Sequence, residues 1–140
     1  MILLDTNVVS ELMRARSDPA VLAWFAGRSA DTLYLTAVSE AELRTGAAIL
    51  PTGQRRDRLV GAIDAMIDQD FAGRILPFDS PAARSFAQIA AARRAAGKPI
   101  MDADCQIAAI ARASGATIAT RNVKDFEGCG ITVINPWNVV

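Results

Sequence analysis

Side chains that could hold a metal ion recur in this sequence where buried strands are expected to end or helices to begin. The residues in such positions are Asp5, Glu42, Asp102, Asp104, Asn122 and Asp125. The chain contains no histidine, so a catalytic metal would have to be held by oxygen ligands. Such a ligand set favours Mg²⁺ or Mn²⁺ over zinc.

Strand-like and helix-like segments alternate along the chain. Short apolar runs predict strands at 1–4, 33–36, 74–78, 116–120 and 131–134. Helical patterns and capping residues predict helices at 6–14, 19–27, 38–49, 54–71, 80–97 and 102–115. This alternation is typical of an α/β fold, a parallel β-sheet flanked by helices in three layers. In such sheets ligands bind in the crevice beyond the carboxyl ends of the strands.

Length and composition limit the number of domains and the cellular compartment that we expect. The chain has 140 residues, 51% of them hydrophobic, which predicts one folded domain over residues 1–140. Fifteen basic and fifteen acidic residues cancel, so net charge predicts neither nucleic-acid nor membrane binding. The start of the chain lacks the pattern of a signal peptide, and Cys105 and Cys129 fit no disulfide framework. We therefore expect a cytoplasmic protein.

Each acidic residue also has a purely structural interpretation. Asp5 could cap the helix that follows it, and Asp102 fits the N-cap position of its helix. Asn122 and Asp125 could serve turn geometry. Glu40 and Glu42 are about 200° apart around a helix, so only one can face a shared site, and Glu42 borders the apolar stripe better. What favours function is the joint arrangement around one crevice.

Four segments, taken in order, resemble the PIN-domain ribonucleases, and most closely the VapC-type toxins of bacterial toxin–antitoxin modules in the FitB-like branch. The segments are Asp5-Thr6-Asn7, Glu42-Leu43-x-x-Gly46, Asp104-x-Gln106-Ile107-Ala108-Ala109 and Thr120-Arg121-Asn122-x-x-Asp125-Phe126. The similarity extends to the Asn135-Pro136-Trp137 ending. It implies a Mg²⁺- or Mn²⁺-dependent endoribonuclease with a small antitoxin partner that occludes the site. We also expect a homodimer and a higher assembly with the antitoxin.

The resemblance assigns roles position by position. Asp5, Glu42 and Asp104 correspond to the three core acids, with Asp5 and Asp104 as direct ligands and Glu42 as a ligand or a water-holding base. The fourth position is often Asp and is Asn122 here. Either Asp125 takes its place or a second metal binds only with substrate. Asp102 is not a core motif position, which agrees with a capping role.

Further side chains are expected to assist. Thr6 and Asn7 adjoin the first acid, and Thr120 is expected to position water or substrate together with Asn122. Arginine and lysine side chains could grip RNA phosphates, which would make binding depend on salt. The candidates are Arg14, Arg16, Arg55, Arg56, Arg58, Arg93, Arg94, Lys98 and Arg121. Trp24, Phe25, Trp137 and Met13 are interpreted as core or interface anchors rather than as platforms for base stacking.

Two other classes of protein place acids at the edge of a parallel sheet. A dehalogenase-type phosphoryl-transfer enzyme needs a second Asp two residues after the first, where this chain has Asn7. A receiver-type domain needs an Asp at the end of its third strand, where the chain offers none until Asp79. A third alternative is a binding protein that kept the fold and lost catalysis, an option raised by Asn122.

Overall fold

The computed structural model describes residues 1–138, and within them the strands form one parallel sheet. The sheet has five strands in the order β3-β2-β1-β4-β5, and every neighbouring pair is parallel. The strands are β1 (Ile2–Leu4), β2 (Leu33–Thr36), β3 (Ile75–Leu76), β4 (Thr117–Ala119) and β5 (Val133–Ile134). The α/β fold with a parallel sheet between helical layers is therefore confirmed.

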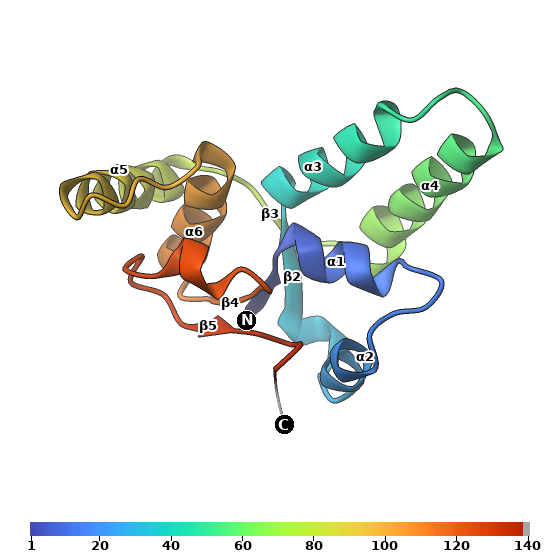
Figure 1. Ribbon diagram of the computed structural model, residues 1–140, viewed down its shortest axis with the longest axis horizontal. Helices are drawn as coiled ribbons and strands as arrows, with labels where there is room; N and C mark the ends of the chain where they lie inside the picture. Colours follow the sequence, from blue (N-terminus) through green and yellow to red (C-terminus); the bar gives the residue numbers. More distant parts are fainter. Residues whose placement is uncertain (139–140) are drawn as a thin grey trace.

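Helices cover both faces of this sheet, as Figure 1 shows, with α5 and α6 grouped on one side and α1 to α4 on the other. Their bounds are α1 (Thr6–Leu12), α2 (Pro19–Ala26), α3 (Ala37–Ala48), α4 (Gln54–Ala65), α5 (Ser80–Ala95) and α6 (Asp102–Ser114). Short helical turns η1 (Ala30–Thr32), η2 (Met66–Asp70) and η3 (Val123–Phe126) complete the set. None of the helices within residues 1–138 combines the length and apolar character needed to cross a membrane.

Alternation along the central strand builds two cores. Leu3 packs with α5 and α6, whereas Leu4 packs with α1 to α4, and both side chains are fully buried. Successive residues of a strand point to opposite faces, so β1 must be apolar throughout. The same alternation recurs in β4, where Ile118 joins the first core and Ala119 the second.

The order of the strands creates a crevice beside β1. The chain proceeds from β1 to β2 and β3 on one side, then returns to β4 and β5 on the other side of β1. The carboxyl ends of β1 and β4 therefore meet where the direction of the connections reverses. This switch point is where open α/β sheets bind ligands, and it places the ends at Leu4 and Ala119 next to each other.

Several predicted boundaries need correction. The strands at 74–78, 116–120 and 131–134 are shorter than their apolar runs. The helix predicted over 54–71 changes at Met66 into a π-helical turn, where the Phe71 amide donates to the carbonyl of Met66 at 2.9 Å. The first helix ends at Leu12 rather than near Arg14. These differences shift element ends without changing the order of elements.

Candidate active site

Asp5 lies in the turn between β1 and α1, at the switch point of the sheet. Its amide donates to the carbonyl of Ala119 at 2.9 Å, which continues the β1–β4 pairing. The residue is only 5% exposed. Its Oδ1 accepts from the Thr6 amide at 2.8 Å, so Asp5 is the N-cap of α1. Its carboxylate also lines an open pocket of about 520 Å³.

The other carboxylate oxygen of Asp5 is held by two neighbours. Oδ2 accepts from the Thr120 hydroxyl at 2.8 Å and from the Asn7 amide nitrogen Nδ2 at 3.3 Å. A carboxylate offers about four acceptor positions, and these bonds with the Thr6 amide use three of them. Asp5 is therefore fixed in orientation while keeping capacity for one further interaction in the pocket.

Thr120 joins β1, α1 and the loop after β4 through one hydroxyl group. Besides donating to Asp5, its Oγ1 accepts from Asn7 Nδ2 at 3.2 Å and from the Asn122 amide at 3.0 Å. The residue is fully buried, and this oxygen has no further bonding capacity. In this arrangement the Thr120 hydroxyl orients Asp5, and Thr120 is not among the residues that line the pocket.

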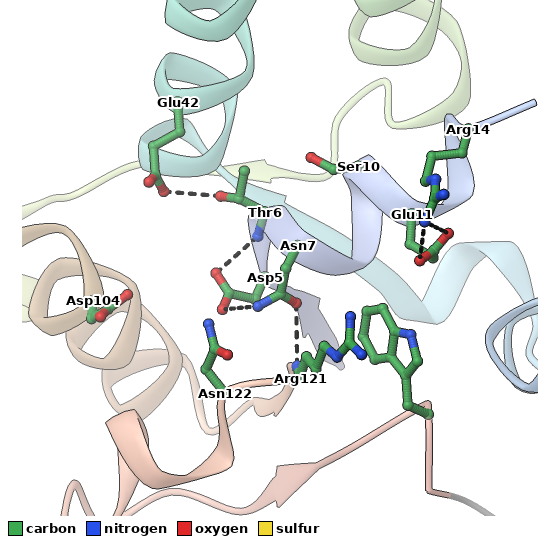
Figure 2. Close-up of a pocket in the computed structure, with 11 residues that line it drawn as sticks. Asp5, Thr6, Asn7, Ser10, Glu11, Arg14, Glu42, Asp104, Arg121 and Asn122 are labelled. Carbon is green, nitrogen blue, oxygen red and sulfur yellow. Dashed lines mark hydrogen bonds and ion pairs between the residues drawn. The ribbon is translucent and has the colours of Figure 1, made fainter. Parts of the chain in front are cut away.

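Glu42 and Asp104 reach the same pocket from two other helices, α3 and α6. Glu42 is exposed, and its Oε1 accepts from the Thr6 hydroxyl at 2.9 Å, which ties α3 to α1. Asp104 is half-buried in the first turn of α6. Figure 2 shows both acids to the left of Asp5, with the side chains of Arg14 and Arg121 extending on the right. The pocket thus has an acidic side and a basic side, the latter formed by Arg121 and by Arg14 with its partner Glu11.

The carboxylates disturb each other's ionisation. Burial raises the pKa of Asp5 despite the hydrogen bonds from Thr120 and Thr6, and the charges of Glu42 and Asp125 add to the rise. The pKa of Asp104 is raised to about 6, first by burial and then by the charges of Asp5, Asp125 and Glu42, with Arg93 opposing. The negative charges on this side of the pocket therefore lack sufficient positive compensation from the protein.

This charge excess fits a divalent cation bound by oxygen ligands. No group of three or more acidic or cysteine side chains within residues 1–138 is arranged to hold one ion directly. Mg²⁺, however, keeps several of its water ligands and needs only one or two carboxylates in direct contact. Asp5 and Asp104, with Glu42 acting through water, are consistent with that kind of binding.

The structure distinguishes Glu42 from Glu40 and Asp104 from Asp102, because in each pair one acid lines the pocket and the other does not. Glu40 pairs with Arg44 at 2.8 Å, away from the pocket that Glu42 lines. Asp102 is exposed and is the first residue of α6, whose N-cap is Met101, without a side-chain capping bond. The N-cap prediction for Asp102 is therefore wrong, because Met101 occupies the N-cap position and Asp102 is already the first helical residue. Asp102 is not among the residues that line the pocket.

The loop after β4 contributes unequally. Asn122 and Arg121 line the pocket, and the Arg121 amide donates to Asn7 Oδ1 at 3.2 Å. Asp125 does not line it, although its charge contributes to the raised pKa of Asp104. Asp125 lies on η3 and is exposed. Its effect on the site is thus electrostatic in this arrangement.

The arginine candidates separate into pocket residues and others. Arg14 lines the pocket but forms an ion pair with Glu11 at 3.2 Å. Arg55 lines a neighbouring groove that shares Thr6, Ser10, Arg14 and Glu42 with the pocket. Arg56 lines neither hollow and is half-buried on α4.

Arg93 is not available for gripping RNA, because it is buried and its guanidinium donates to the carbonyls of Lys98, Asp125 and Glu127. It fastens the loop after β4 to α5. Its companion candidate Arg94 is exposed on α5. The sequence alone does not show which of two adjacent arginines is buried.

Sequence reasoning missed three pocket residues: Ser10, Glu11 and Trp137. Helical periodicity could have found the first two, because Ser10 follows Thr6 by four positions and Glu11 follows Asn7 by four. No spacing rule links Trp137 to the site. It was interpreted as a core or interface anchor, and it does pack against the core that includes Leu4, but it also faces the pocket.

Known proteins are similar to this chain over almost its whole length. The PIN domain model matches residues 2–127. The chain is 47% identical over 137 residues to VapC ribonuclease Y4jK of Sinorhizobium fredii, covering 98% of both chains. It is 43% identical over 138 residues to toxin FitB of Neisseria gonorrhoeae, covering 99% of both.

A solved structure of FitAB bound to the IR36 DNA fragment is similar throughout. Its matching chain is 41% identical, with a TM-score of 0.94, and the match covers 100% of this chain and 98% of that one. The family model and the two relatives also match most of the chain. Together they show that the chain belongs to the PIN-domain family, with VapC and FitB toxins among its relatives.

Proposed function

We propose that this protein is the toxin of a toxin–antitoxin module, an endoribonuclease that hydrolyses RNA phosphodiester bonds with the help of Mg²⁺ or Mn²⁺. One observation carries the chemistry. Three acids from separate segments line one pocket: Asp5, Glu42 and Asp104. Burial raises the pKa of Asp104, and the charges of Asp5 and Glu42 add to this rise. The relatives named as a VapC ribonuclease and as toxin FitB support the substrate class and the role.

The proposed metal ligands are Asp5 and Asp104, with Glu42 as a third ligand or as the group that holds a metal-bound water. When bound, a divalent cation supplies the positive charge that an anionic phosphodiester needs in an acidic pocket, and it lowers the pKa of a coordinated water. Asn122 at the pocket wall, or Asp125 through its charge, would support the bound ion.

The remaining residues prepare the pocket. Thr120 and Asn7 hold one oxygen of Asp5 in place, so the other interactions of this carboxylate need little reorganisation. Thr6 holds Glu42 toward α1. Asn122 presents an uncharged amide at the pocket wall, where it can donate to a phosphate oxygen. Arg121 contributes positive charge on the opposite side.

We also propose that a small antitoxin protein covers this pocket in the resting module and that the toxin itself forms a homodimer. The FitAB structure, which matches the whole chain, supports an assembly of this kind. The working compartment would be the cytoplasm, where RNA is accessible, with one nuclease domain spanning residues 1–140.

The test is cleavage of defined single-stranded RNAs by the purified protein with Mg²⁺, with Mn²⁺ and with EDTA. We expect discrete products with either ion and none with EDTA, and no cleavage of single-stranded DNA of the same sequence. If RNA binds but is not cleaved with either ion, the protein is a binding module that kept the fold, and the proposed activity is wrong.

A further inference from the structure

Trp137 and Arg121 form a pair at the basic side of the pocket. The guanidinium carbon Cζ of Arg121 lies 5.1 Å from the centroid of the Trp137 ring, over its face. Both residues line the pocket. They come from distant elements, since Arg121 follows β4 and Trp137 follows β5. Their approach is therefore a product of the fold rather than of local sequence.

Both partners are held by hydrogen bonds that fix their backbones. The Trp137 amide donates to Asn135 Oδ1 at 2.9 Å, and the half-buried ring packs against the core on one face of the sheet. The Arg121 amide donates to Asn7 Oδ1 at 3.2 Å, next to Asp5. The pair is thus positioned relative to the same side chain, Asn7, that orients the proposed metal ligand.

Arg121 and Arg14 both line the pocket, but they differ in whether a nearby carboxylate neutralises the charge of the guanidinium. Arg14 is paired with Glu11, whose side chain is only 7% exposed. Within residues 1–138 the ion pairs of arginines involve Arg14 and Arg44, so Arg121 has no carboxylate partner there. Arg121 is exposed, and Figure 2 shows it extending away from the acidic side chains Glu42 and Asp104.

The guanidinium of Arg121 is planar and cationic, lies over the face of the indole, and belongs to an exposed residue. Nucleobases exposed in single-stranded RNA stack on such arginine and aromatic planes. A phosphate group alone would need only the charge of Arg121, without the ring beneath it. The ring, its fixed backbone and its place at the pocket wall are what favour a base over a bare anion.

We propose that Arg121 and Trp137 form a stacking subsite for one nucleobase of the RNA strand, adjacent to the phosphate that is cleaved. This subsite rests on the proposed ribonuclease function. The subsite would bind a base by stacking rather than by hydrogen bonds to the edge of the base. It would therefore position the RNA strand without strong selection for one nucleotide sequence.

The test uses a single-stranded RNA that the wild-type protein cleaves at one defined site, and a set of copies with one abasic residue at each position near that site. Base–aromatic stacking corresponds to a loss of about 5- to 150-fold when the base is removed. We expect kcat/KM to fall by this factor at one abasic position in the wild type. Trp137→Leu should lose a similar factor on intact RNA and show no further loss at that position.

The ratio of rates on intact and abasic RNA is measured within each variant, so a partial loss of folding cancels from it. Trp137→Phe, which keeps an aromatic face, should keep the abasic penalty at the same position. Equal abasic penalties in the wild type and in Trp137→Leu would overturn the subsite and leave Trp137 to a protein interface. Failure of the wild type to cleave intact RNA would instead overturn the proposed function, and the subsite with it.

Discussion

Asp5 performs two roles that sequence reasoning treats as alternatives. One carboxylate oxygen caps α1 through the Thr6 amide, and the carboxylate also lines the pocket. Because a carboxylate can accept several hydrogen bonds, capping does not exclude metal binding. The hydrogen bonds that join Thr120 to Asp5 and to Asn7 were not predictable, since they connect positions more than a hundred residues apart.

The choice between Asp102 and Asp104 yields a prediction with a matched control. Asp104→Asn should reduce metal-dependent cleavage by at least about 100-fold, because it removes a charge from the pocket. Asp102→Asn should leave cleavage close to that of the wild type, since Asp102 is exposed outside the pocket. It should cost less than about 0.5 kcal/mol of stability, as is usual for surface substitutions. Cleavage rates and melting temperatures of both variants check this. An inactive Asp102→Asn with an active Asp104→Asn would reverse the assignment.

The raised pKa of Asp104 predicts how stability depends on pH in the presence of EDTA. Between the usual value of 3.8 and about 6, the folded protein keeps a proton that the unfolded chain has lost. The stability of the wild type should therefore fall as pH rises through this window, by less than the full shift implies, because solvent screens the half-buried carboxylate. Asp104→Asn lacks this group and should fall less. Urea unfolding of both proteins from pH 4 to pH 8 measures the difference, and parallel stability curves would contradict the proposed charge repulsion.

At the scale of elements, local signals predicted several helix termini better than strand lengths. Asp18 caps α2 with Pro19 in its first turn, and Gly27 ends it, as the sequence pattern indicated. Gly115, in the left-handed conformation, ends α6 as expected. The short β3 and β5 lie at the edges of the sheet, where pairing with neighbours rather than apolar character sets the length. No local signal marks the π-helical turn after α4.

The loop that positions Asn122 and Arg121 depends on a buried arginine. Arg93→Gln should destabilise the protein by about 1.5–3 kcal/mol, because it removes the charged donor of three part-buried hydrogen bonds to the carbonyls of Lys98, Asp125 and Glu127. Arg94→Gln, one position along α5 and exposed, should change stability by less than about 0.5 kcal/mol. Chemical unfolding of the two variants decides this. Equal small losses would show that the three carbonyl bonds contribute little.

At the scale of the whole molecule, the order of motifs along the chain was more informative than any single motif. Asp5, Glu42 and Asp104 each had a local structural interpretation, yet the sheet order places all three around one switch point. The match to the PIN family argues against the two alternative classes, the receiver-type domain and the dehalogenase-type enzyme. The pairing of Arg121 with Trp137 was out of reach of sequence, because it depends on how β4 and β5 direct the segments after them.

A cation that binds the folded protein should stabilise it by mass action. At 100 times its dissociation constant, Mn²⁺ or Mg²⁺ should add about 2.7 kcal/mol of stability, whereas low concentrations of Zn²⁺ should not. Asp102→Asn should show the same gain, and Asp104→Asn a smaller one. Melting curves with EDTA and with millimolar Mn²⁺ measure it. Identical wild-type curves under both conditions would favour the non-catalytic alternative.

Asp5 is the proposed anchor of the metal-dependent RNA-cleaving site, and Asp5→Asn tests this role most directly. Asn is as good an N-cap as Asp, so α1 should be retained while one charge is removed from the pocket. We expect cleavage of a defined RNA with Mg²⁺ or Mn²⁺ to fall by at least about 100-fold. The variant should still show a cooperative melting transition in EDTA, although its amide nitrogen cannot accept the hydrogen bonds from Thr120 and Asn7. Cleavage by a folded Asp5→Asn protein at the wild-type rate would contradict the account.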